Sequence, residues 1–486
     1  MSCTTALFGG TFTPEEIEQT RARRGLLTME LEVGTRCNFS CRYCYVGDPQ
    51  PTARTELTPD EQKNAVGQAQ ALGARKIILL GGEPLLYPHT PDFCEWLHGR
   101  GLAVEMFTNG TGLTQELAGR LHGLGVNVVL KWHSSDPAIQ NDLTGTAGAH
   151  EVMASAYANL RAAGYPSPSA KLALSTPICR QNIADIPEMW RRMRREGIEP
   201  YFEMITPQGR ARSSDTALAP SAEETRRLFE TLQAIDRDEF GRVWEPQPPL
   251  AGNVCLRHQF SCLVNAAGDV MPCVGVPLAV GNIRAKPLAE ILSDSEVIAD
   301  LRDHTRTIQG ACGTCKKAAV CYGCRGAAYH LTGNYLGSDP LCWHNQNGAD
   351  CARFPMPADA LVPHRPPSRM VVSLDAVSER AATLTARADA DSPHCRDGVL
   401  TEAAHIEVMA QATAALHGYR SSSRRGMLVG AKDVEITRPV AAGETVTVTL
   451  HKEASLEPFG VIRAEVWRQD GQLVSKGELK IWHEAS

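Results

Sequence analysis

Three cysteines stand close together near the start of the chain, in the segment CNFSCRYCYV. Cys37, Cys41 and Cys44 have the spacing C-x3-C-x2-C and directly follow an apolar run that predicts a strand. A structural zinc site needs four ligands, which three thiolates cannot supply. Three thiolates can hold three irons of a [4Fe–4S] cluster and leave the fourth iron open to bind and reduce a small molecule. The alternatives are a surface loop with incidental cysteines and a zinc site with a distant fourth ligand.

A glycine-rich turn, LLGGEPLL, follows the next predicted strand. Gly81 and Gly82 permit close backbone approach and positive φ angles. Their carbonyl groups and the carboxylate of Glu83 could receive an ammonium group. Such a turn alone is typical of any strand-to-helix connection. Together with the upstream cysteines it predicts a binding site for a small amine.

These paired motifs resemble those of the radical S-adenosylmethionine (radical SAM) superfamily, over about residues 27–206. The resemblance implies that the three cysteines hold the cluster. It also implies that the open iron chelates the amino and carboxylate groups of SAM. Reductive cleavage would then give methionine and a 5′-deoxyadenosyl radical, which abstracts hydrogen from a substrate.

The resemblance further implies which residues contact SAM. Gly81, Gly82 and Glu83 would line its amino group, and Tyr43 would pack near the adenine. Other polar residues at strand ends are candidates for ribose, carboxylate and substrate contacts, each with a structural role as its alternative: Thr108, Asn109, Lys131, His133, Ser134, Ser175 and Glu203.

The elements that must position these residues alternate along the chain. Apolar runs predict strands at 27–33, 76–80, 102–109, 126–132, 171–176 and 199–205. Helical patterns occupy 60–73, 114–125, 151–164 and 183–197. This alternation indicates an α/β fold with a parallel sheet, here a partial (β/α)6 TIM-type barrel.

Eight more of the chain's 16 cysteines lie between Cys255 and Cys342, enough for two four-ligand sites. Zinc is one reading, because C-x2-C pairs also bind zinc. The pattern resembles the SPASM domain, which carries auxiliary iron–sulfur clusters, although two residues separate Cys321 from Cys324 where the family usually has three. The resemblance implies two ligand sets, which would make three [4Fe–4S] clusters in total: Cys255, Cys262, Cys273 and Cys324 for auxiliary cluster I, and Cys312, Cys315, Cys321 and Cys342 for auxiliary cluster II.

Full ligation by four cysteines would leave these auxiliary clusters to relay electrons rather than to bind substrate. The remaining cysteines have simpler interpretations. Cys94, Cys179 and Cys395 are expected to be packing residues, and Cys351 a spectator near the second auxiliary cluster.

The last part of the chain resembles the hotdog fold, an α+β architecture, and within it the FabZ-like and aryl-polyene-type acyl-carrier dehydratases. The resemblance rests on LVPHRPPSRMVVSLDAV and DGVLTEAAHIEVMAQATAALHGY. We expect a helix at 402–419 wrapped by antiparallel strands at 426–436, 444–450, 459–469 and 472–482. In the family a His and an acidic residue act on an acyl thioester. Glu407 matches the acidic position, and either His394 or His364 is its partner.

The family's HFPG-type stretch is absent, and the chain reads SPHCRDG at that point. The alternative to catalysis is therefore a domain that only docks, dimerises or binds an acyl group. Hotdog domains commonly pair, which would make the chain a homodimer. The predicted domains are a lead-in at 1–26, the radical SAM core at 27–245, the SPASM domain at 246–357 and the hotdog domain at 360–486.

The composition fits a globular protein, with 43% hydrophobic and 21% charged residues. A net charge of −6 argues against nucleic acid as a partner. No apolar run reaches the roughly 18 residues of a membrane span, so we expect no membrane association. The N-terminus lacks the pattern of a secretion signal, and oxygen-labile clusters favour a reducing cytoplasm.

Three functions compete on this evidence. The favoured one is an enzyme that abstracts hydrogen from a small metabolite or from a carrier-protein-bound acyl or aminoacyl thioester. It would take electrons from an external donor of the flavodoxin or ferredoxin type. The second is a SPASM maturase that modifies a ribosomal peptide or a protein side chain. The third is an iron–sulfur electron carrier, against which the Gly-Gly-Glu-Pro turn argues.

Overall fold

The computed structural model describes residues 12–46, 55–213, 218–345, 355–358, 361–377, 381–420, 426–456 and 459–483. The chain divides into two compact units. The first comprises residues 1–304, 323–331 and 341–343, and the second comprises residues 305–322, 332–340 and 344–486. Cys351 lies outside the described residues.

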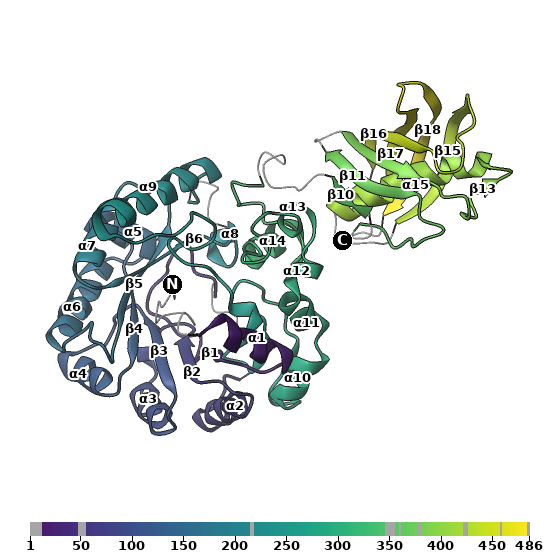
Figure 1. The fold of residues 1–486 in the computed structure, drawn as a ribbon. Helices are drawn as coiled ribbons and strands as arrows, with labels where there is room; N and C mark the ends of the chain where they lie inside the picture. The colour runs from purple at the N-terminus through teal and green to yellow at the C-terminus, as the bar shows by residue number, and fades with distance from the viewer. Residues whose placement is uncertain are drawn as a thin grey trace. The chain divides into compact units, whose positions relative to one another are not determined.

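The first unit is built on six parallel strands in the order β6-β5-β4-β3-β2-β1, which Figure 1 shows as an arc with the helices on its outer side. The predicted partial (β/α)6 barrel is therefore confirmed. The strands are β1 (Thr28–Glu32), β2 (Lys76–Leu80), β3 (Ala103–Thr108), β4 (Asn127–Lys131), β5 (Leu172–Ile178) and β6 (Glu199–Met204). Each predicted strand segment contains the strand that forms there, except that β5 extends two residues further.

Helices separate the strands: α2 (Pro59–Ala71), α3 (Thr90–Gly99), α4 (Gln115–Gly123), α5 (Pro137–Thr144), α6 (Ala149–Ala162), α7 (Ile186–Arg195), α8 (Arg210–Ser213) and α9 (Ala222–Phe240). The sequence patterns missed α3, α5, α8 and α9. Ser221 and Glu224 form a capping box at the start of α9. That local signal could have identified this helix.

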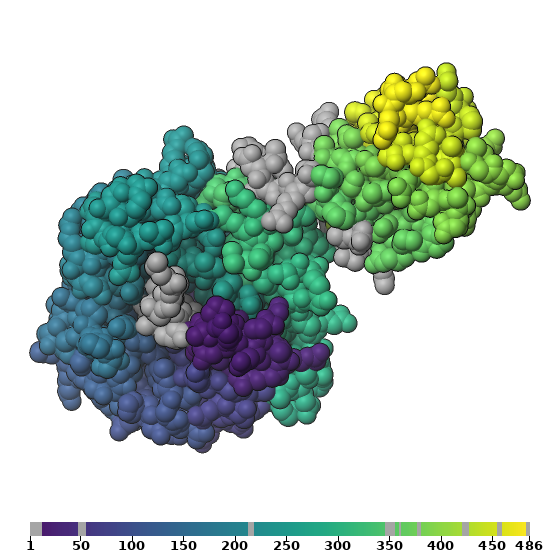
Figure 2. All heavy atoms as spheres, viewed as in Figure 1, coloured from purple at the N-terminus to yellow at the C-terminus, as the bar shows by residue number. Residues whose placement is uncertain are grey.

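An additional helix, α1 (Pro14–Ala22), precedes the barrel, and it appears in purple on the near surface in Figure 2. Ile17 of α1 packs with Leu27 and Phe260 in a small apolar cluster. Leu27 immediately precedes β1. Helix α1 therefore lies at the amino-terminal end of β1, away from the loops that follow the strands.

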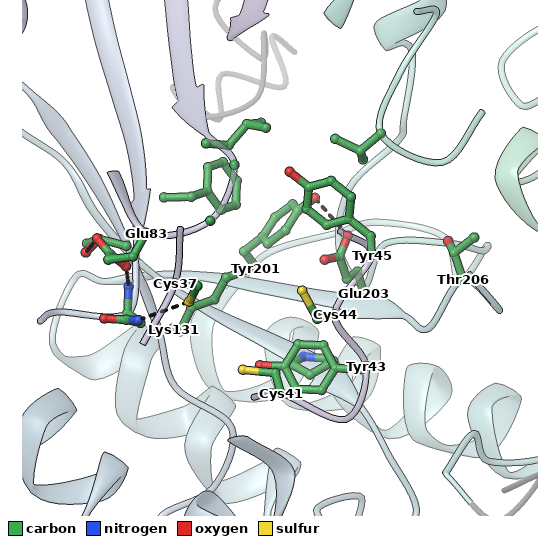
Figure 3. A pocket seen from close by; sticks show the side chains of 18 of the residues that line it. Cys37, Cys41, Tyr43, Cys44, Tyr45, Glu83, Lys131, Tyr201, Glu203 and Thr206 are labelled. Carbon is green, nitrogen blue, oxygen red and sulfur yellow. Dashed lines mark hydrogen bonds between the residues drawn. The ribbon is translucent and has the colours of Figure 1, made fainter. Parts of the chain in front are cut away.

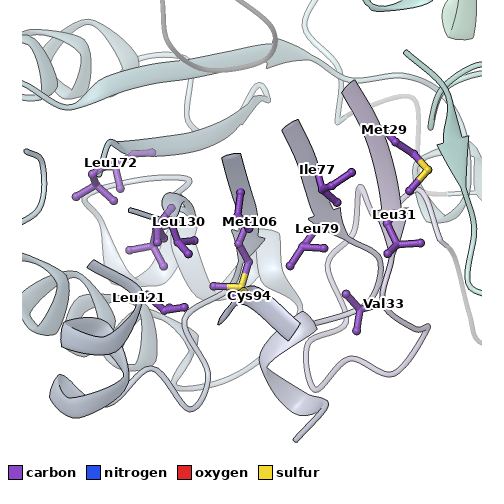
Figure 4. Packing of buried hydrophobic residues seen from close by; sticks show 14 of the residues in the cluster. Met29, Leu31, Val33, Ile77, Leu79, Cys94, Met106, Leu121, Leu130 and Leu172 are labelled. Carbon is purple, nitrogen blue, oxygen red and sulfur yellow. The ribbon is translucent and has the colours of Figure 1, made fainter. Parts of the chain in front are cut away.

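The barrel strands bury their two faces differently. In β1, Met29 and Leu31 belong to the main apolar core, which Figure 4 shows between the sheet and the helices. The alternate residues Glu30 and Glu32 are also buried, but they are charged. Successive side chains of a strand point to opposite faces, so one face supplies the apolar core and the other carries polar groups into the barrel.

The sheet continues beyond β1 through a small hairpin. Strand β7 (Leu263–Val264) runs parallel to β1, and β8 (Asp269–Met271) and β9 (Gly281–Asn282) follow in antiparallel order. The Cys-rich region contains short helices, which the sequence patterns did not identify: η2 (Arg257–Gln259), α10 (Leu288–Asp294), α11 (Glu296–Arg302), α12 (His304–Thr307), α13 (Gly310–Gly313) and α14 (Arg325–Thr332).

The second unit contains a seven-stranded sheet in the order β10-β11-β12-β16-β17-β18-β15, antiparallel throughout. The strands are β10 (Met356–Pro357), β11 (Val371–Val377), β12 (Ala381–Arg387), β15 (Gly426–Ile436), β16 (Thr445–Leu456), β17 (Phe459–Arg468) and β18 (Leu473–His483). A separate small ribbon pairs β13 (Cys395–Arg396) with β14 (Val399–Leu400). The sequence patterns missed β11 and β12.

One long helix, α15 (Glu402–Arg420), packs on this sheet. Its buried residues Met409 and Ala412 share a core with Leu384 and Val448 of the strands. This arrangement confirms the predicted α+β hotdog domain. Among the described residues, no helix is both long and apolar enough to cross a membrane.

Candidate functional site

A cavity of about 200 Å³ opens among the loops that follow the barrel strands (Figure 3). All three cysteines of the first motif line it, together with the Gly-Gly-Glu turn. Most of the other lining residues are apolar or aromatic: Phe39, Tyr43, Tyr45, Ile78, Leu80, Phe107, Pro177, Tyr201, Met204, Ile205 and Val274. A mostly apolar cavity with a few polar groups is typical of a small-molecule site.

The cysteine loop is held by the end of α5. The Ser40 amide donates to the Thr144 carbonyl at 3.1 Å, and the Arg42 amide donates to the Leu143 carbonyl at 3.0 Å. Gly145 makes this approach possible, because a Cβ there would lie 2.5 Å from the Ser40 carbonyl oxygen. The sequence patterns gave no sign of this contact, since α5 itself was missed.

In the described part of the chain, no three His, Cys, Asp or Glu side chains surround one metal ion. A cubane cluster does not need such convergence, because each thiolate binds a different iron. Burial raises the pKa of Cys41 to about 12, so this thiol keeps its proton until a metal displaces it. The set of three sulfurs on one loop therefore fits a cluster better than a single ion.

The Gly-Gly-Glu turn is bonded directly to the chain that leads into Cys37. The Gly82 amide donates to the Gly34 carbonyl, and the Glu83 amide donates to the Arg36 carbonyl, both at 2.8 Å. A Cβ on Gly82 would lie only 2.1 Å from the Arg36 carbonyl oxygen. Glycine at position 82 is thus required by the close approach of these two loops.

Glu83 accepts three hydrogen bonds from within the protein. Its carboxylate accepts hydrogen bonds from the Leu85 amide at 3.0 Å, the Thr108 hydroxyl at 2.7 Å and the Asn109 amide at 2.6 Å. Burial nevertheless raises its pKa to about 7. A carboxylate has about four acceptor positions, so about one remains for a ligand. Glu83 ties the turn to the end of β3, a function that the sequence alone did not indicate.

Asn109 reaches the cysteine loop from the end of β3. Its side-chain amide nitrogen lies 3.8 Å from the sulfur of Cys37 and donates to the Asn38 side chain at 3.1 Å. Its own oxygen accepts from the Thr111 amide at 2.8 Å. The structure therefore places Asn109 in the cavity wall, beside a cysteine of the first motif.

Tyr43 is half-buried in the cavity wall between two of the cysteines. Its hydroxyl hydrogen-bonds Nε2 of His133, and the two rings meet edge to face with centroids 5.0 Å apart. Burial lowers the pKa of His133 to about 3, so the imidazole is neutral near pH 7. The tyrosine ring is thus fixed by a partner from the loop after β4.

Two other residues that were predicted to contact SAM lie in different places. Glu203 lines the cavity and accepts a hydrogen bond from the Tyr201 hydroxyl at 3.0 Å. Ser134 is not part of the cavity lining, and its hydroxyl bonds the carboxylate of Asp185 instead. The structure brings Glu203 to the site and leaves Ser134, in the loop after β4, outside the cavity lining.

The cavity also contains residues that the sequence patterns missed. Arg257 pairs with the buried Glu30 at 2.9 Å. Tyr45 donates to Glu32 at 3.1 Å. These partners lie far apart in the sequence or alternate with apolar strand residues, so no local pattern could identify them.

The other cysteines are distributed over both units. Cys255, Cys262, Cys273, Cys324 and Cys342 belong to the first unit, whereas Cys312, Cys315 and Cys321 belong to the second. Cys324 lies 3.8 Å from the Thr206 hydroxyl, and Thr206 lines the cavity. In the second unit the Asp339 amide and the Asn345 side chain each lie 3.3 Å from the sulfur of Cys312. Cys94 and Cys179 are buried and Cys395 is partly buried.

The hotdog domain contains a second group of titratable side chains. Nε2 of His364 lies 3.7 Å from Oε1 of Glu407, and each side chain is 35% exposed. The Gln411 side chain donates to the same oxygen at 2.9 Å. His394 instead bonds the Ser368 carbonyl at 3.0 Å. Of the two predicted partners, the structure therefore places His364 beside Glu407.

Comparison with known families agrees with this architecture. Residues 31–193 match the radical SAM superfamily, residues 255–316 match the SPASM iron–sulfur cluster-binding domain, and residues 356–485 match the ApeP dehydratase family. The radical SAM and SPASM domains imply [4Fe–4S] clusters and SAM as cofactors.

Curated relatives match the first two domains. The AdoMet-dependent heme synthase of Methanosarcina barkeri is 29% identical over 67% of this chain and 98% of its own length. The mycofactocin maturase MftC of Mycobacterium tuberculosis is 26% identical over 70% of this chain and 89% of its own length.

A solved structure shows the same fold. Streptococcus suis SuiB, crystallised with S-adenosylmethionine, covers 66% of this chain and 78% of its own, with a TM-score of 0.50 at 15% identity. The cysteine loop, the Gly-Gly-Glu turn and the hotdog sheet agree with these family matches. The chain is a radical SAM enzyme that carries a SPASM iron–sulfur domain and a C-terminal ApeP dehydratase-like domain.

Proposed function

We propose that the barrel cavity binds SAM and a [4Fe–4S] cluster and abstracts hydrogen from a small metabolite or from a carrier-bound acyl or aminoacyl thioester. The observation that carries this proposal is the junction of two loops at one opening. Cys37, Cys41 and Cys44 line the same cavity as Gly81 and Gly82. When bound, the cluster and SAM supply the 5′-deoxyadenosyl radical.

The chain's own residues would bind and orient the cofactors. Cys37, Cys41 and Cys44 would ligate the cluster. The Gly81 and Gly82 backbone and the remaining acceptor position of Glu83 would receive the amino group of SAM. These assignments are supported by the bonding of the turn to the cysteine loop at 2.8 Å, which fixes both parts relative to each other.

Other cavity residues would contact the rest of SAM or the substrate. Tyr43 would pack near the adenine, because His133 holds its ring in the cavity wall. Asn109 and Glu203 line the cavity and are candidates for polar contacts. The Ser134 hydroxyl is bonded to Asp185. A contact between Ser134 and SAM therefore stays a prediction. The apolar walls would exclude water from a reactive radical.

The cysteines from Cys255 to Cys342 would hold two auxiliary clusters, for three in total. Cys312, Cys315, Cys321 and Cys342 would ligate auxiliary cluster II. These clusters would pass electrons from an external donor of the flavodoxin or ferredoxin type. Such oxygen-labile groups favour a reducing cytoplasm.

The fused hotdog domain supports an acyl thioester as the substrate class, because its match is to a dehydratase family. The contrary reading, a maturase acting on a peptide, is supported by the similarity to a mycofactocin maturase. The two readings differ in what the cavity must accept. A carrier-bound acyl chain is a thin linear substrate, whereas a peptide brings a polar backbone.

A test of the main proposal uses anaerobically reconstituted full-length protein. With dithionite as reductant, we expect conversion of SAM to methionine and 5′-deoxyadenosine, detected by liquid chromatography. Acyl-pantetheine thioesters should increase this conversion more than short peptides if the favoured substrate class is right. No cleavage with any reductant or substrate would overturn the proposal.

A second candidate activity is supported by one distance, the 3.7 Å between His364 and Glu407. We propose that these residues act as acid and base on an acyl thioester in the hotdog domain, with His394 as a support for the neighbouring loop. Glu407→Gln should remove dehydration of a 3-hydroxyacyl-pantetheine and leave SAM cleavage unchanged. A matched control is Glu402→Gln, which alters an exposed residue of the same helix.

The hotdog domain would also pair two chains into a homodimer. Its sheet ends at β15, where Met427 and Val429 are exposed. Sedimentation velocity of the full chain should give twice the monomer mass if this pairing occurs.

A further inference from the structure

The four cysteines that the SPASM resemblance assigns to auxiliary cluster I do not share one environment. This inference rests on the proposed presence of that cluster. The residues around Cys262 show the separation most clearly. Cys262 and Val264 belong to the main core with Met29 and Leu31. Leu263, between them, packs with Ile78 and Leu80 on the opposite face.

The alternation has a simple cause. Residues 262–264 lie beside β1, with the Glu30 amide donating to the Cys262 carbonyl at 2.9 Å and Glu30 paired with Leu263 in register. Successive side chains on such a strand point to opposite faces. Leu263 faces the cavity side, so Cys262 must face the helix side, where it is 0% exposed.

Cys255, Cys273 and Cys324 lie on the cavity side. Cys273 interacts electrostatically with both Cys255 and Cys324. Each of the three also interacts with a residue of the cavity lining: Arg257 acts electrostatically on Cys255 and Cys273, and the Thr206 hydroxyl lies 3.8 Å from the sulfur of Cys324. Glu30 acts electrostatically on both Cys262 and Cys273, but Arg302 acts on Cys262 alone of these two, and no other cysteine is among the groups that act on Cys262.

Arg302, a charged neighbour of Cys262, shows how enclosed this position is. Arg302 is buried, and its guanidinium donates to the Gly25 carbonyl at 2.8 Å. Gly25 lies just before β1, and Arg302 is the last residue of α11. A cluster bound on the cavity side would need Cys262 to turn through the strand, which would break its pairing with β1.

We propose that Cys255, Cys273 and Cys324 alone hold auxiliary cluster I, that Cys262 is a packing residue, and that the fourth iron is open to an exogenous donor from the cavity. The donor would be an anionic or thiol group of the substrate, since such groups bind iron in these clusters. The cavity would then bring the substrate between two clusters, each with one open position.

The first test counts iron in a background that cannot build the SAM cluster, Cys37→Ala/Cys41→Ala/Cys44→Ala. This background should retain about eight irons per chain if two auxiliary clusters are present. Adding Cys262→Ala should leave about eight irons, whereas adding Cys273→Ala should leave about four. Cys94→Ala is the matched control, because Cys94 is equally buried in the same core.

A loss of about four irons in Cys262→Ala, with a normal unfolding midpoint, would overturn the proposal. If Cys262→Ala fails to fold, Cys262→Val keeps the volume of the side chain without offering a ligand. The iron count is independent of SAM cleavage. Failure of this inference is therefore distinguishable from failure of the proposed function, which would appear as absent cleavage in the unmodified protein.

The second test probes the open iron directly, in the same background with Cys262 intact. Reduced protein is treated with ¹³C-cyanide and examined by electron–nuclear double resonance. We expect a ¹³C coupling that disappears in the Cys273→Ala variant. Absence of any ¹³C coupling in a sample with about eight irons would show that both clusters are fully ligated by the chain, and would overturn the proposal.

Discussion

The barrel sheet and the hotdog sheet bury charge to very different extents. The barrel strands are parallel and covered on both faces, so their polar residues, such as Glu30 and Glu105, are removed from water. The hotdog strands are antiparallel, and β17 alternates buried with partly exposed residues. Parallel sheets with helices on one side and a filled interior leave no solvent face, whereas an antiparallel sheet can face water on one side.

The difference matters for where each region can do chemistry. In the barrel, polar groups from β1, β3, β4 and β6 and from the turn after β2 meet in one cavity, and burial raises the pKa of two of them, Glu30 and Glu83. In the hotdog domain the candidate pair His364 and Glu407 is about one-third exposed. Deep burial suits a site that must exclude water, and partial exposure suits a site that receives a long thioester arm.

The largest expected effect separates the two regions outright. Cys41→Ala should abolish SAM cleavage, because a cluster held by two cysteines cannot present one open iron in the same way. The hotdog pair His364 and Glu407 should then still bind acyl-pantetheine, measured by calorimetry. If Cys41→Ala still cleaves SAM, the radical site is not where we place it.

The next effect compares ion pairs. Lys76 and Glu105 form a buried pair at 3.1 Å in the barrel, and Lys476 and Glu435 form an exposed pair at 3.0 Å in the hotdog sheet. Lys76→Met should cost about 3–5 kcal/mol because it removes the cation that pairs with the buried carboxylate of Glu105. Lys476→Met should cost about 0–1 kcal/mol. Urea unfolding measures both, and equal costs would contradict the contrast in burial.

The pH dependence of Glu83 gives a third test. Burial raises its pKa from 4.5 to about 7, so the folded state binds the proton more tightly than the unfolded state. The resulting stability is full below about pH 4.5 and is lost as the pH rises through about 7. Between pH 5 and pH 8, the free energy of unfolding should fall by about 2–3 kcal/mol more in the unmodified protein than in Glu83→Gln.

The cluster-free protein is the right sample for this measurement, because no metal then influences the carboxyl group. Glu61→Gln serves as the control, since Glu61 lies near the surface and its pKa is lowered to about 2 by hydrogen bonds from Arg284. A pH profile of Glu83→Gln that parallels the unmodified protein would show that Glu83 ionises normally.

The smallest effect concerns a neutral buried contact in the hotdog domain. Nδ1 of His405 and the Ser475 hydroxyl lie 3.0 Å apart, and both residues are buried. Ser475→Ala should lower the free energy of unfolding by about 1 kcal/mol, well below the cost of Lys76→Met. A cost as large as that of the barrel ion pair would show that the hotdog core is also dominated by buried polar groups.

The sequence by itself determined the local parts of this protein. The spacing of Cys37, Cys41 and Cys44 and the Gly81–Gly82 turn are short-range features, because each motif sits on one loop. Strand positions were also readable, since apolar runs predict the buried faces of β1 to β6. The hotdog helix α15 and its four following strands were predicted for the same reason.

Only the tertiary structure decided which side chains meet. The Glu83 carboxylate accepts hydrogen bonds from Thr108 and Asn109 at the end of the next strand. It therefore fixes the turn to β3 and is also a candidate contact for SAM. His364 rather than His394 lies beside Glu407, because the position of each loop on the helix is set by packing. Cys262 faces the core because its neighbours pair with β1 in one register. Spacing along a chain cannot report the face of a strand until its partner strand is known.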